Sequence, residues 1–426
     1  MATMIATTHP AAASAAPPVR QDAAVMGLVG LAHMISHFSQ LILPPLFPWL
    51  KDAFQVSFVE LGGLLTIFFA VSCVVQASSG FVVDRFGPRP VLFGGLALLA
   101  VAALGYAMST SYAMLAFFAV IAGLGNGVFH PVNYTLLNRK IHSSRLAHAF
   151  SVHGITGSLG WALAPAMMVP IALAFTWRVA LASAGVLALA VMIVLALNRR
   201  HLTVELARAV TGNLPGSAVE PTFAFLRIPA VWMCFAFFFF YAAALSGVQA
   251  FAPEAARQLH GVSGAAAALC LPVYMVCSAG GMILGGFMAS DPQRCERIVG
   301  LGFGIAATLG LAMAFADVPA AWVPVMFGLM GFGAGTAAPS RDLLVKRSAP
   351  DNATGRVYGV VYSGIDIGQA VAPIAFGVMM DLHEPSHVWV GIALLQAVLI
   401  VSAFNVRKVR RSAFVSAGAA VGGSAG

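Results

Sequence analysis

Charged residues are scarce in this chain of 426 residues: only 9% are Asp, Glu, Lys or Arg, whereas 60% are hydrophobic. Soluble domains carry about 25% charged residues, so this chain cannot cover a water-exposed surface of ordinary composition. The low charge therefore argues against a soluble enzyme and against a soluble nucleic-acid-binding domain. The apolar residues form long runs from Ala23 to Val406, which indicates that most of the chain lies in lipid.

Cysteine spacing and catalytic motifs are also missing. The five cysteines show neither metal-binding nor redox spacing. The sequence contains no GxxxxGK[ST] loop for ATP, and no nucleophile motif surrounds its Ser, His and Asp residues. We therefore expect a protein that is not an enzyme, that needs no cofactor and no resident metal, and that does not hydrolyse ATP.

The apolar runs predict transmembrane helices. Lipid offers the backbone no hydrogen-bond partners, so a spanning segment must be a helix of about 20 residues or a strand of a closed barrel, and these runs are too long for strands. We expect an all-α membrane protein with twelve transmembrane helices, at 24–49, 58–83, 91–109, 113–138, 147–172, 177–198, 228–252, 263–289, 298–316, 321–346, 356–380 and 388–405.

The basic residues predict the orientation. Nineteen of the 23 Lys and Arg residues lie on the side that holds both termini, Arg341 falls within a span, and only Lys51, Arg178 and Arg257 lie opposite. The positive-inside rule then places both termini in the cytoplasm. This asymmetry also explains the pI of about 9.6, so the basic charge is no sign of nucleic acid. We expect residues 1–22 and 406–426 to be disordered cytoplasmic tails.

The helices divide into two related sets of six. The longest connection, a cytoplasmic linker at 199–227, separates a predicted bundle at 23–198 from one at 228–405. Shifting residues 123–165 by 208 positions aligns them without a gap on 331–373, with eleven identities in 43 positions. Six-helix halves related by an axis along the membrane normal suit alternating access around a cavity at mid-membrane.

The loop after the second predicted helix reads GFVVDRFGPRPVL, at 80–92. It resembles the signature loop of the major facilitator superfamily, whose glycine, acidic and basic positions are occupied here by Gly80, Asp84, Arg85, Gly87 and Arg89. The resemblance extends over 23–405 and implies that this loop is a cytoplasmic gate. We expect Gly80 to allow a close approach and Gly87 a tight turn.

Three other features of the sequence bear on the resemblance. The stretch GLGNGVFHP, at 123–131, resembles fosmidomycin-resistance-type bacterial exporters of the same family. The family's fourth helix often carries an arginine tied to proton coupling, but the corresponding residue here is Ala119. Ala164 precedes Pro165 where many exporters carry a Gly-Pro pair. Any proton site must then use other groups, and the direction of transport, by antiport or symport, stays open.

Polar side chains recur at helical spacing inside several spans, where each is costly in lipid and so indicates a functional position. The resemblance implies that helices one, four, seven and ten line the cavity. In the first half the candidate substrate-binding residues form two stripes, each at i, i+4 and i+7: His33, His37 and Gln40, and Asn126, His130 and Asn133. In the second half the candidates are Tyr241, Gln249, Arg341 and Tyr362.

Asp366 is the one carboxylate predicted near the middle of a helix. Carboxyl and imidazole groups both exchange protons, so we expect Asp366, with His37 or His130, to couple transport to protons. The alternative is that Asp366 pairs with a buried base or caps a local hydrogen bond, and that each histidine makes an interhelical hydrogen bond. Arg341 receives an anionic group of the substrate, extends to the membrane interface or pairs with the neighbouring Asp342.

The sequence thus favours a secondary active transporter that moves a small anionic or amphiphilic organic solute with protons. Its expected partners are the solute, protons and the lipid bilayer, and we expect a monomer. The alternative is a carrier of transition-metal ions that uses the intramembrane histidines His33, His37, His130 and His153.

Overall fold

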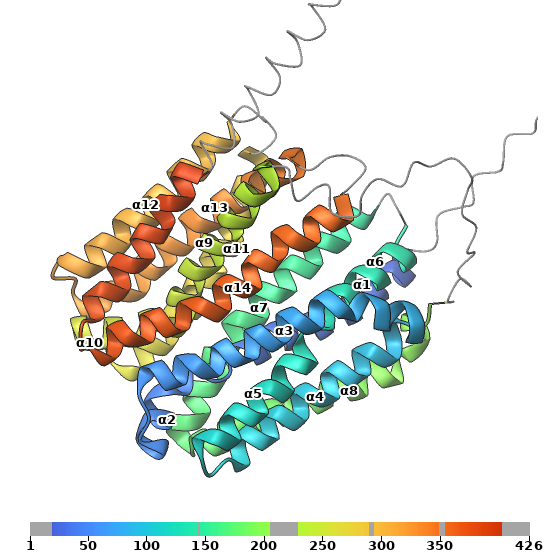
Figure 1. The fold of residues 1–426 in the computed structure, drawn as a ribbon, viewed down its shortest axis with the longest axis horizontal. Coiled ribbons are helices and arrows are strands. Elements are labelled where there is room, and N and C mark those ends of the chain that lie inside the picture. Colours follow the sequence, from blue (N-terminus) through green and yellow to red (C-terminus); the bar gives the residue numbers. More distant parts are fainter. Residues whose placement is uncertain (1–18, 143–144, 205–228, 289–293, 349–353, 403–426) are drawn as a thin grey trace, which may run out of the picture.

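The computed structural model describes residues 19–142, 145–204, 229–288, 294–348 and 354–402 (Figure 1). Regular secondary structure within these ranges is entirely helical, and twelve segments are long and apolar enough to cross a membrane. The predicted all-α membrane fold is confirmed. The predicted tails and most of the predicted linker lie outside the described residues, and α1 begins at Val19, within the stretch predicted to be a tail.

The first six spans run side by side in the lower part of Figure 1. They are formed by α1 (Val19–Gln40) with η1 (Pro44–Leu46) and α2 (Phe47–Phe54), α3 (Phe58–Phe86), α4 (Pro88–Met108), α5 (Tyr112–Asn126) with α6 (Phe129–Lys140), α7 (Leu146–Ala174) and α8 (Trp177–Leu197). A short helix, η3 (Arg199–Leu202), follows them.

The second six spans occupy the upper part of the same view. They are α9 (Pro229–Ala250), α11 (Gly264–Met288), α12 (Cys295–Phe315), α13 (Val323–Ser348), α14 (Thr354–Asp381) and the segment Pro385–Ser402. The short helices α10 (Ala252–His260) and η5 (Ala320–Trp322) lie between spans.

Two of the predicted helices are broken. The helix expected over 24–49 ends at Gln40 and resumes as η1, which begins with Pro44. The helix expected over 113–138 divides into α5 and α6 around Gly127. Pro131 lacks the amide that would bond to the Gly127 carbonyl in a continuous helix. The Ser79 hydroxyl of α3 donates to that carbonyl instead, at 3.5 Å.

The sequence repeat corresponds to a repeated packing arrangement. In the first half, a Cβ on Gly127 would lie 2.5 Å from the Ser72 carbonyl oxygen of α3. In the second half, a Cβ on Gly335 of α13 would clash with the Ser278 carbonyl of α11. Two further pairs of equivalent glycines meet equivalent neighbours: Gly123 at Phe68 and Gly331 at Tyr274, and Gly125 at Gly95 and Gly333 at Gly302. Glycine is needed at these positions because the helix backbones touch.

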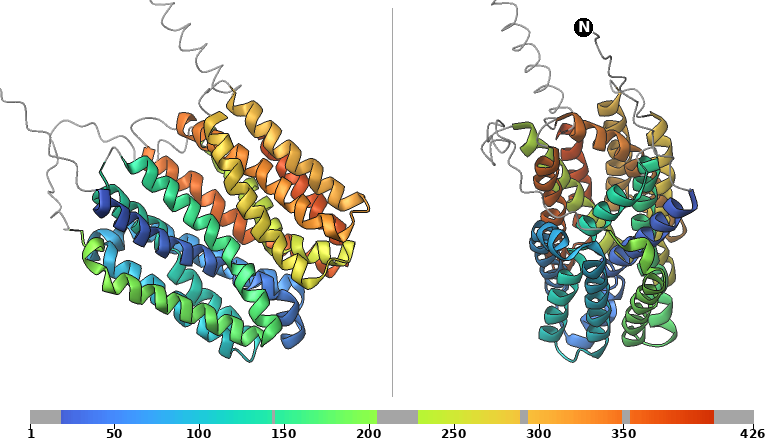
Figure 2. Two further views of the ribbon diagram at one scale, coloured as in Figure 1. Left: turned by 180° about the vertical axis from the view of Figure 1, so that it is seen from behind. Right: turned by 90° about the vertical axis from the view of Figure 1, so that its right-hand side faces the viewer.

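The two sets of six helices meet along two helix pairs, α3 with α14 and α7 with α11 (Figure 2). Along the first pair, a Cβ on Gly62 would lie 2.5 Å from the Pro373 carbonyl oxygen, and a Cβ on Gly377 would lie 2.7 Å from the Phe58 carbonyl oxygen. The Thr66 hydroxyl donates to the Ala370 carbonyl at 2.5 Å. The backbones of α3 and α14 therefore touch along several helical turns.

Candidate functional site

Four histidines from three spans meet inside the first half. His33 and His37 come from α1, His130 from α6 and His153 from α7. The His33 ring stacks on that of His153 with 3.6 Å between centroids, and it lies 4.1 Å from the His37 ring and 5.2 Å from the His130 ring. One ligand atom from each of His33, His130 and His153 lies within 4.8 Å of the other two. We call these four residues the histidine cluster.

Asn133 of α6 and two glycines of α7, Gly157 and Gly160, lie next to the histidine cluster. The Asn133 amide nitrogen lies 3.5 Å from Nδ1 of His33 and 3.3 Å from Nε2 of His153. On α7, a Cβ on Gly157 would lie 2.8 Å from Nδ1 of His37, and a Cβ on Gly160 would clash with the Met34 carbonyl of α1. The side chains of His33, His37 and His153 are each less than 10% exposed. These glycines let α7 approach α1 while leaving room for the imidazoles.

A second polar group adjoins the cluster, centred on the Asn126 amide. Its Oδ1 accepts hydrogen bonds from Ser36 at 2.7 Å and from Gln40 at 3.3 Å, and its Nδ2 donates to the Ser72 hydroxyl of α3 at 2.9 Å. Trp161 of α7 donates from its indole nitrogen to Oε1 of Gln40 at 2.9 Å, and its ring stacks on that of His37. The structure thus joins the two predicted stripes of the first half in one buried network.

The second half contributes fewer polar side chains. Nε2 of Gln369 on α14 donates to Oε1 of Gln249 on α9 at 3.3 Å. The Tyr241 ring lies 6.3 Å from that of Phe303. Asp366, one turn from Gln369, accepts a hydrogen bond from Gln76 of α3 at 2.8 Å. The side chains of Arg341 and Tyr362 lie outside the part of the chain that the structure describes in detail.

An apolar cavity of about 250 Å³ lies between the halves, near the end of the bundle where α14 terminates. Pro44, Pro48 and Pro165 line its first-half wall, and Gln249 and Leu271 line its second-half wall. Gln249 is thus shared by the cavity and the buried polar contacts.

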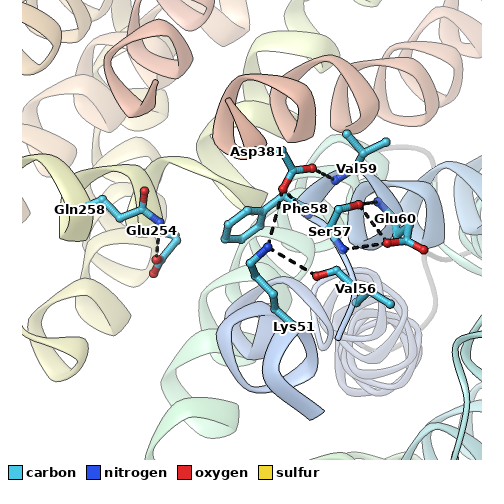
Figure 3. A network of polar contacts seen from close by, with 9 residues as sticks. All are labelled: Lys51, Val56, Ser57, Phe58, Val59, Glu60, Glu254, Gln258 and Asp381. Carbon is cyan, nitrogen blue, oxygen red and sulfur yellow. Dashed lines mark hydrogen bonds and ion pairs between the residues drawn. The ribbon is translucent and has the colours of Figure 1, made fainter. Parts of the chain in front are cut away.

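Asp381, at the end of α14, caps α3 across the two halves (Figure 3). Its Oδ1 accepts from the Phe58 amide and its Oδ2 from the Val59 amide, both at 2.8 Å. Lys51 of α2 lies 3.7 Å from the same carboxylate and also contacts the Val56 carbonyl. A carboxylate at a helix N-terminus satisfies free amides and interacts favourably with the helix dipole. We call this end of the bundle the Asp381 end.

The predicted gate loop lies between α3 and α4. Gly87 has φ +83°, which a residue with a side chain rarely adopts, so the expected tight turn is present. Arg89 donates to the Thr203 hydroxyl at 3.0 Å, and the Arg85 guanidinium lies 5.4 Å from the Phe86 ring centre. The expected close approach at Gly80 is wrong for the described residues, because a Cβ there would meet no atom within 4 Å. The Asp84 side chain is not among those described.

Periodicity did not single out several residues that complete these networks. Ser72, Gln76 and Trp161 supply partners to Asn126, Asp366 and Gln40. Each is a polar or amphipathic residue inside an apolar span, and that position alone was the available signal. The sequence did not indicate a special role for Asp381, because it lies at a helix end, where charged residues are common.

The comparisons with known proteins agree with this fold. The sequence profile of the Major Facilitator Superfamily matches residues 29–373. The Fosmidomycin resistance protein of Escherichia coli is 24% identical over 332 residues, covering 75% of this chain and 78% of that protein. A probable nitrate/nitrite transporter of Mycobacterium tuberculosis is 24% identical over 394 residues, covering 90% of this chain and 95% of its own.

Other similarities are shorter or structural. An uncharacterized MFS-type transporter of Bacillus subtilis is 29% identical over 142 residues, which is 33% of this chain and only 34% of that relative. The crystal structure of a bacterial homolog of the human lysosomal transporter Spinster superimposes with a TM-score of 0.74 at 14% identity, covering 92% of this chain and 98% of its own. The profile match, the twelve spans and the shared fold together show that this chain belongs to the major facilitator superfamily.

Proposed function

We propose that the protein is a secondary active transporter of the bacterial inner membrane, which moves a small anionic or amphiphilic organic solute by proton-coupled alternating access. The observation that carries this proposal is the buried polar network that joins α1, α6 and α7. Polar groups in a membrane interior are costly, so a network of this size at the centre of one half indicates a binding site. The two bundles, at 23–198 and 228–405, rock about the α3–α14 and α7–α11 contacts.

The solute binds between the two halves. The first half contributes the polar residues His33, His37, Gln40, Asn126, His130 and Asn133, and the second half Tyr241, Gln249, Arg341 and Tyr362. Gln249 supports this assignment because its Nε2 is buried without a hydrogen-bond partner, although its Oε1 accepts from Gln369. A buried amide with an unused donor is costly, and a bound solute oxygen would satisfy it.

The coupling proton resides on Asp366. Its carboxylate is held by Gln76 from the other half, so a change of its charge alters a contact that the rocking motion makes and breaks. His37 and His130 were expected as its partners, but their ring contacts are with the other members of the histidine cluster, Trp161 and Tyr134. We therefore assign His37 and His130 to ligand binding and the proton to Asp366.

An anionic solute is supported by the names of two relatives and by one arginine. Fosmidomycin, a phosphonate, and nitrate are both anions, and the proteins named for them cover most of this chain. Arg341 lies on α13, and a guanidinium offers paired donors to a carboxylate or phosphonate. The gate residues Gly80, Asp84, Arg85, Gly87 and Arg89 then face the cytoplasm, as do both termini.

The test begins with purified protein. A thermal-shift screen of small organic anions, with fosmidomycin and nitrate included, identifies compounds that bind the folded state, because such compounds raise the melting temperature. Each compound that binds is then followed into proteoliposomes with an imposed pH gradient. We expect accumulation that collapses when a protonophore removes the gradient. Flux that is indifferent to the gradient would contradict proton coupling, and the lack of any flux for every bound anion would contradict the transport proposal.

A further inference from the structure

We propose that the histidine cluster binds a first-row transition-metal ion, with His33, His130 and His153 as ligands and His37 beside them. This inference goes beyond the proposed function, because it assigns the polar site of the first half a metal ion in addition to the organic solute. It rests on that site being a ligand site, but metal binding is measurable without transport.

The geometry is close to that of a coordination site. Tetrahedral metal ions hold imidazole nitrogens at about 2.0–2.1 Å, which places two ligand nitrogens about 3.3 Å apart. The ligand atoms of the three histidines lie within 4.8 Å of one another. Closing this gap takes rotations of side chains, and in particular the stacked rings of His33 and His153 must turn toward a common point.

The donor set selects the class of ion. No carboxylate of the described residues contacts the rings, so the site offers neutral nitrogen donors only. Imidazole suits ions such as Zn²⁺, Co²⁺, Ni²⁺ and Cu²⁺, whereas Mg²⁺ and Ca²⁺ prefer oxygen.

Two buried polar atoms at the histidine cluster lack a hydrogen-bond partner among the described residues. These atoms are Nδ1 of His37 and Oδ1 of Asn133, and neither makes a hydrogen bond of standard geometry. An unsatisfied buried polar atom is costly, so its persistence calls for an explanation. Gly157 faces the rings, where a Cβ would lie 2.9 Å from Nε2 of His33, so the glycine keeps this space open.

Asn133 fits the role of a supporting residue. Histidine ligands commonly make a second hydrogen bond through the ring nitrogen that does not bind the metal, and this bond fixes the ring. The Asn133 amide lies within 3.5 Å of ring nitrogens of both His33 and His153. One asparagine therefore orients two of the three ligands.

Three protein ligands leave one tetrahedral position open. That position accepts water when the ion arrives alone, or an oxygen of a small carboxylate when the ion arrives as a complex. The free ion and its carboxylate complex would bind the histidines in the same way. An experiment with and without a chelating carboxylate separates them.

The experiment titrates Co²⁺ into the purified full-length protein after removal of any affinity tag. Cobalt in a tetrahedral nitrogen site absorbs visible light far more strongly than the hydrated ion. We expect a saturable band equivalent to one ion per chain. In a parallel arm with excess citrate, persistence of the band identifies a mixed complex, and its loss identifies the free ion as the species bound. A wild-type protein that gives no band in either arm would overturn the proposal.

Variants assign the ligands. We expect His153→Asn and His130→Asn each to weaken Co²⁺ binding by at least about 100-fold, and Asn133→Ala by about 10- to 100-fold. The matched control is His148→Asn, because His148 is exposed on the same helix as His153 and should bind as the wild type does. Equal affinity in the control and the cluster variants would also overturn the proposal.

A further measurement does not depend on the variants folding. X-ray absorption of wild-type protein loaded with Co²⁺ should show three imidazole nitrogens around the ion, and an all-oxygen shell would refute the assignment. Because none of these measurements involves a membrane gradient, their failure leaves the transport of an organic anion to be judged separately. Conversely, a protein that binds Co²⁺ but moves no solute would refute the proposed function alone.

Discussion

Gln76 of α3 donates a hydrogen bond to Asp366 of α14, with 2.8 Å between Nε2 and Oδ2. The two helices belong to different halves, so this bond crosses the contact between the halves. A hydrogen bond to an ionised acceptor is about twice as strong as one between neutral groups. Protonation of Asp366 therefore weakens a contact between the halves, which is what coupling to a proton requires.

The first prediction concerns Asp366→Asn. This change keeps the size of the side chain but removes its charge, so pH-gradient-driven accumulation in proteoliposomes should be lost. Exchange of labelled solute across the membrane should persist, because binding and rocking do not need the proton.

The companion variant Gln76→Ala removes the hydrogen bond and leaves the carboxylate in place. It should lower gradient-driven accumulation, because protonation of Asp366 then no longer changes this contact between the halves. Concentrative transport that is unchanged in Asp366→Asn would eliminate Asp366 as the coupling group.

The second prediction concerns Asp381→Asn at the Asp381 end. The carboxylate accepts two backbone amides and lies near Lys51, and hydrogen bonds to charged groups contribute about 1.5–3 kcal/mol each. Even about 1.4 kcal/mol of lost stabilisation shifts the balance between closed and open states tenfold. Labelling of a cysteine introduced at Val169, which lines the apolar cavity and is only 5% exposed, should accelerate by about this factor.

The labelling experiment uses a background in which the five native cysteines are replaced. Its control is Glu254→Gln, at the same end, because Glu254 pairs with Arg257 within α10 and does not join the halves. If both variants label at the wild-type rate, the Asp381 contact does not hold this end closed.

The third prediction concerns the glycines that both halves use for close packing. Gly335→Ala should lower the melting temperature of the purified protein, because the new methyl group would meet the Ser278 carbonyl. Overpacking of this kind typically costs about 1–3 kcal/mol. Gly127→Ala, the equivalent change in the first half, should behave alike, since its Cβ would lie 2.5 Å from the Ser72 carbonyl oxygen.

Gly286→Ala is the control for these two variants, because a Cβ there would meet nothing within 4 Å. It should leave the melting temperature unchanged or raise it slightly, since alanine favours helix more than glycine does. A uniform response across all three positions would mean that helix propensity, rather than backbone contact, decides the outcome.

The fourth prediction concerns Arg341→Gln. Neutralising the charge should reduce transport of an anionic solute far more than transport of a neutral one, because only the anion gains from a guanidinium. The comparison uses paired solutes in the same proteoliposomes. An equal loss for both would assign Arg341 a structural role.

The sequence predicted those parts of the fold that depend on composition and period. The twelve apolar runs correspond to twelve candidate spans. The i, i+4 and i+7 spacing predicted two polar stripes, one beginning at His33 and one at Asn126, and the structure brings these two stripes into contact. The break around Gly127 was not predicted, because proline and glycine are common in membrane helices. Nor was the pairing of Asp366 with Gln76, since helical periodicity says which residues share a face but not which helix of the other half lies opposite.

The histidine cluster shows a further limit of the same kind. His153 lies on a helix whose other polar residues do not form a stripe with it, and only the crossing of α7 over α1 at Gly157 and Gly160 brings it to His33. A close crossing depends on three-dimensional packing, which a single sequence encodes only as scattered small residues.

The internal repeat is unequal in its chemistry. His130 and Asn126 correspond to Ala338 and Ala334 in the second copy, and both alanines are buried. Under the proposed function, a ligand bound by the histidine cluster would move with the first half. The contacts of the solute with the imidazoles would therefore stay constant through the transport cycle, whereas its contacts with Gln249 and the other second-half residues would change.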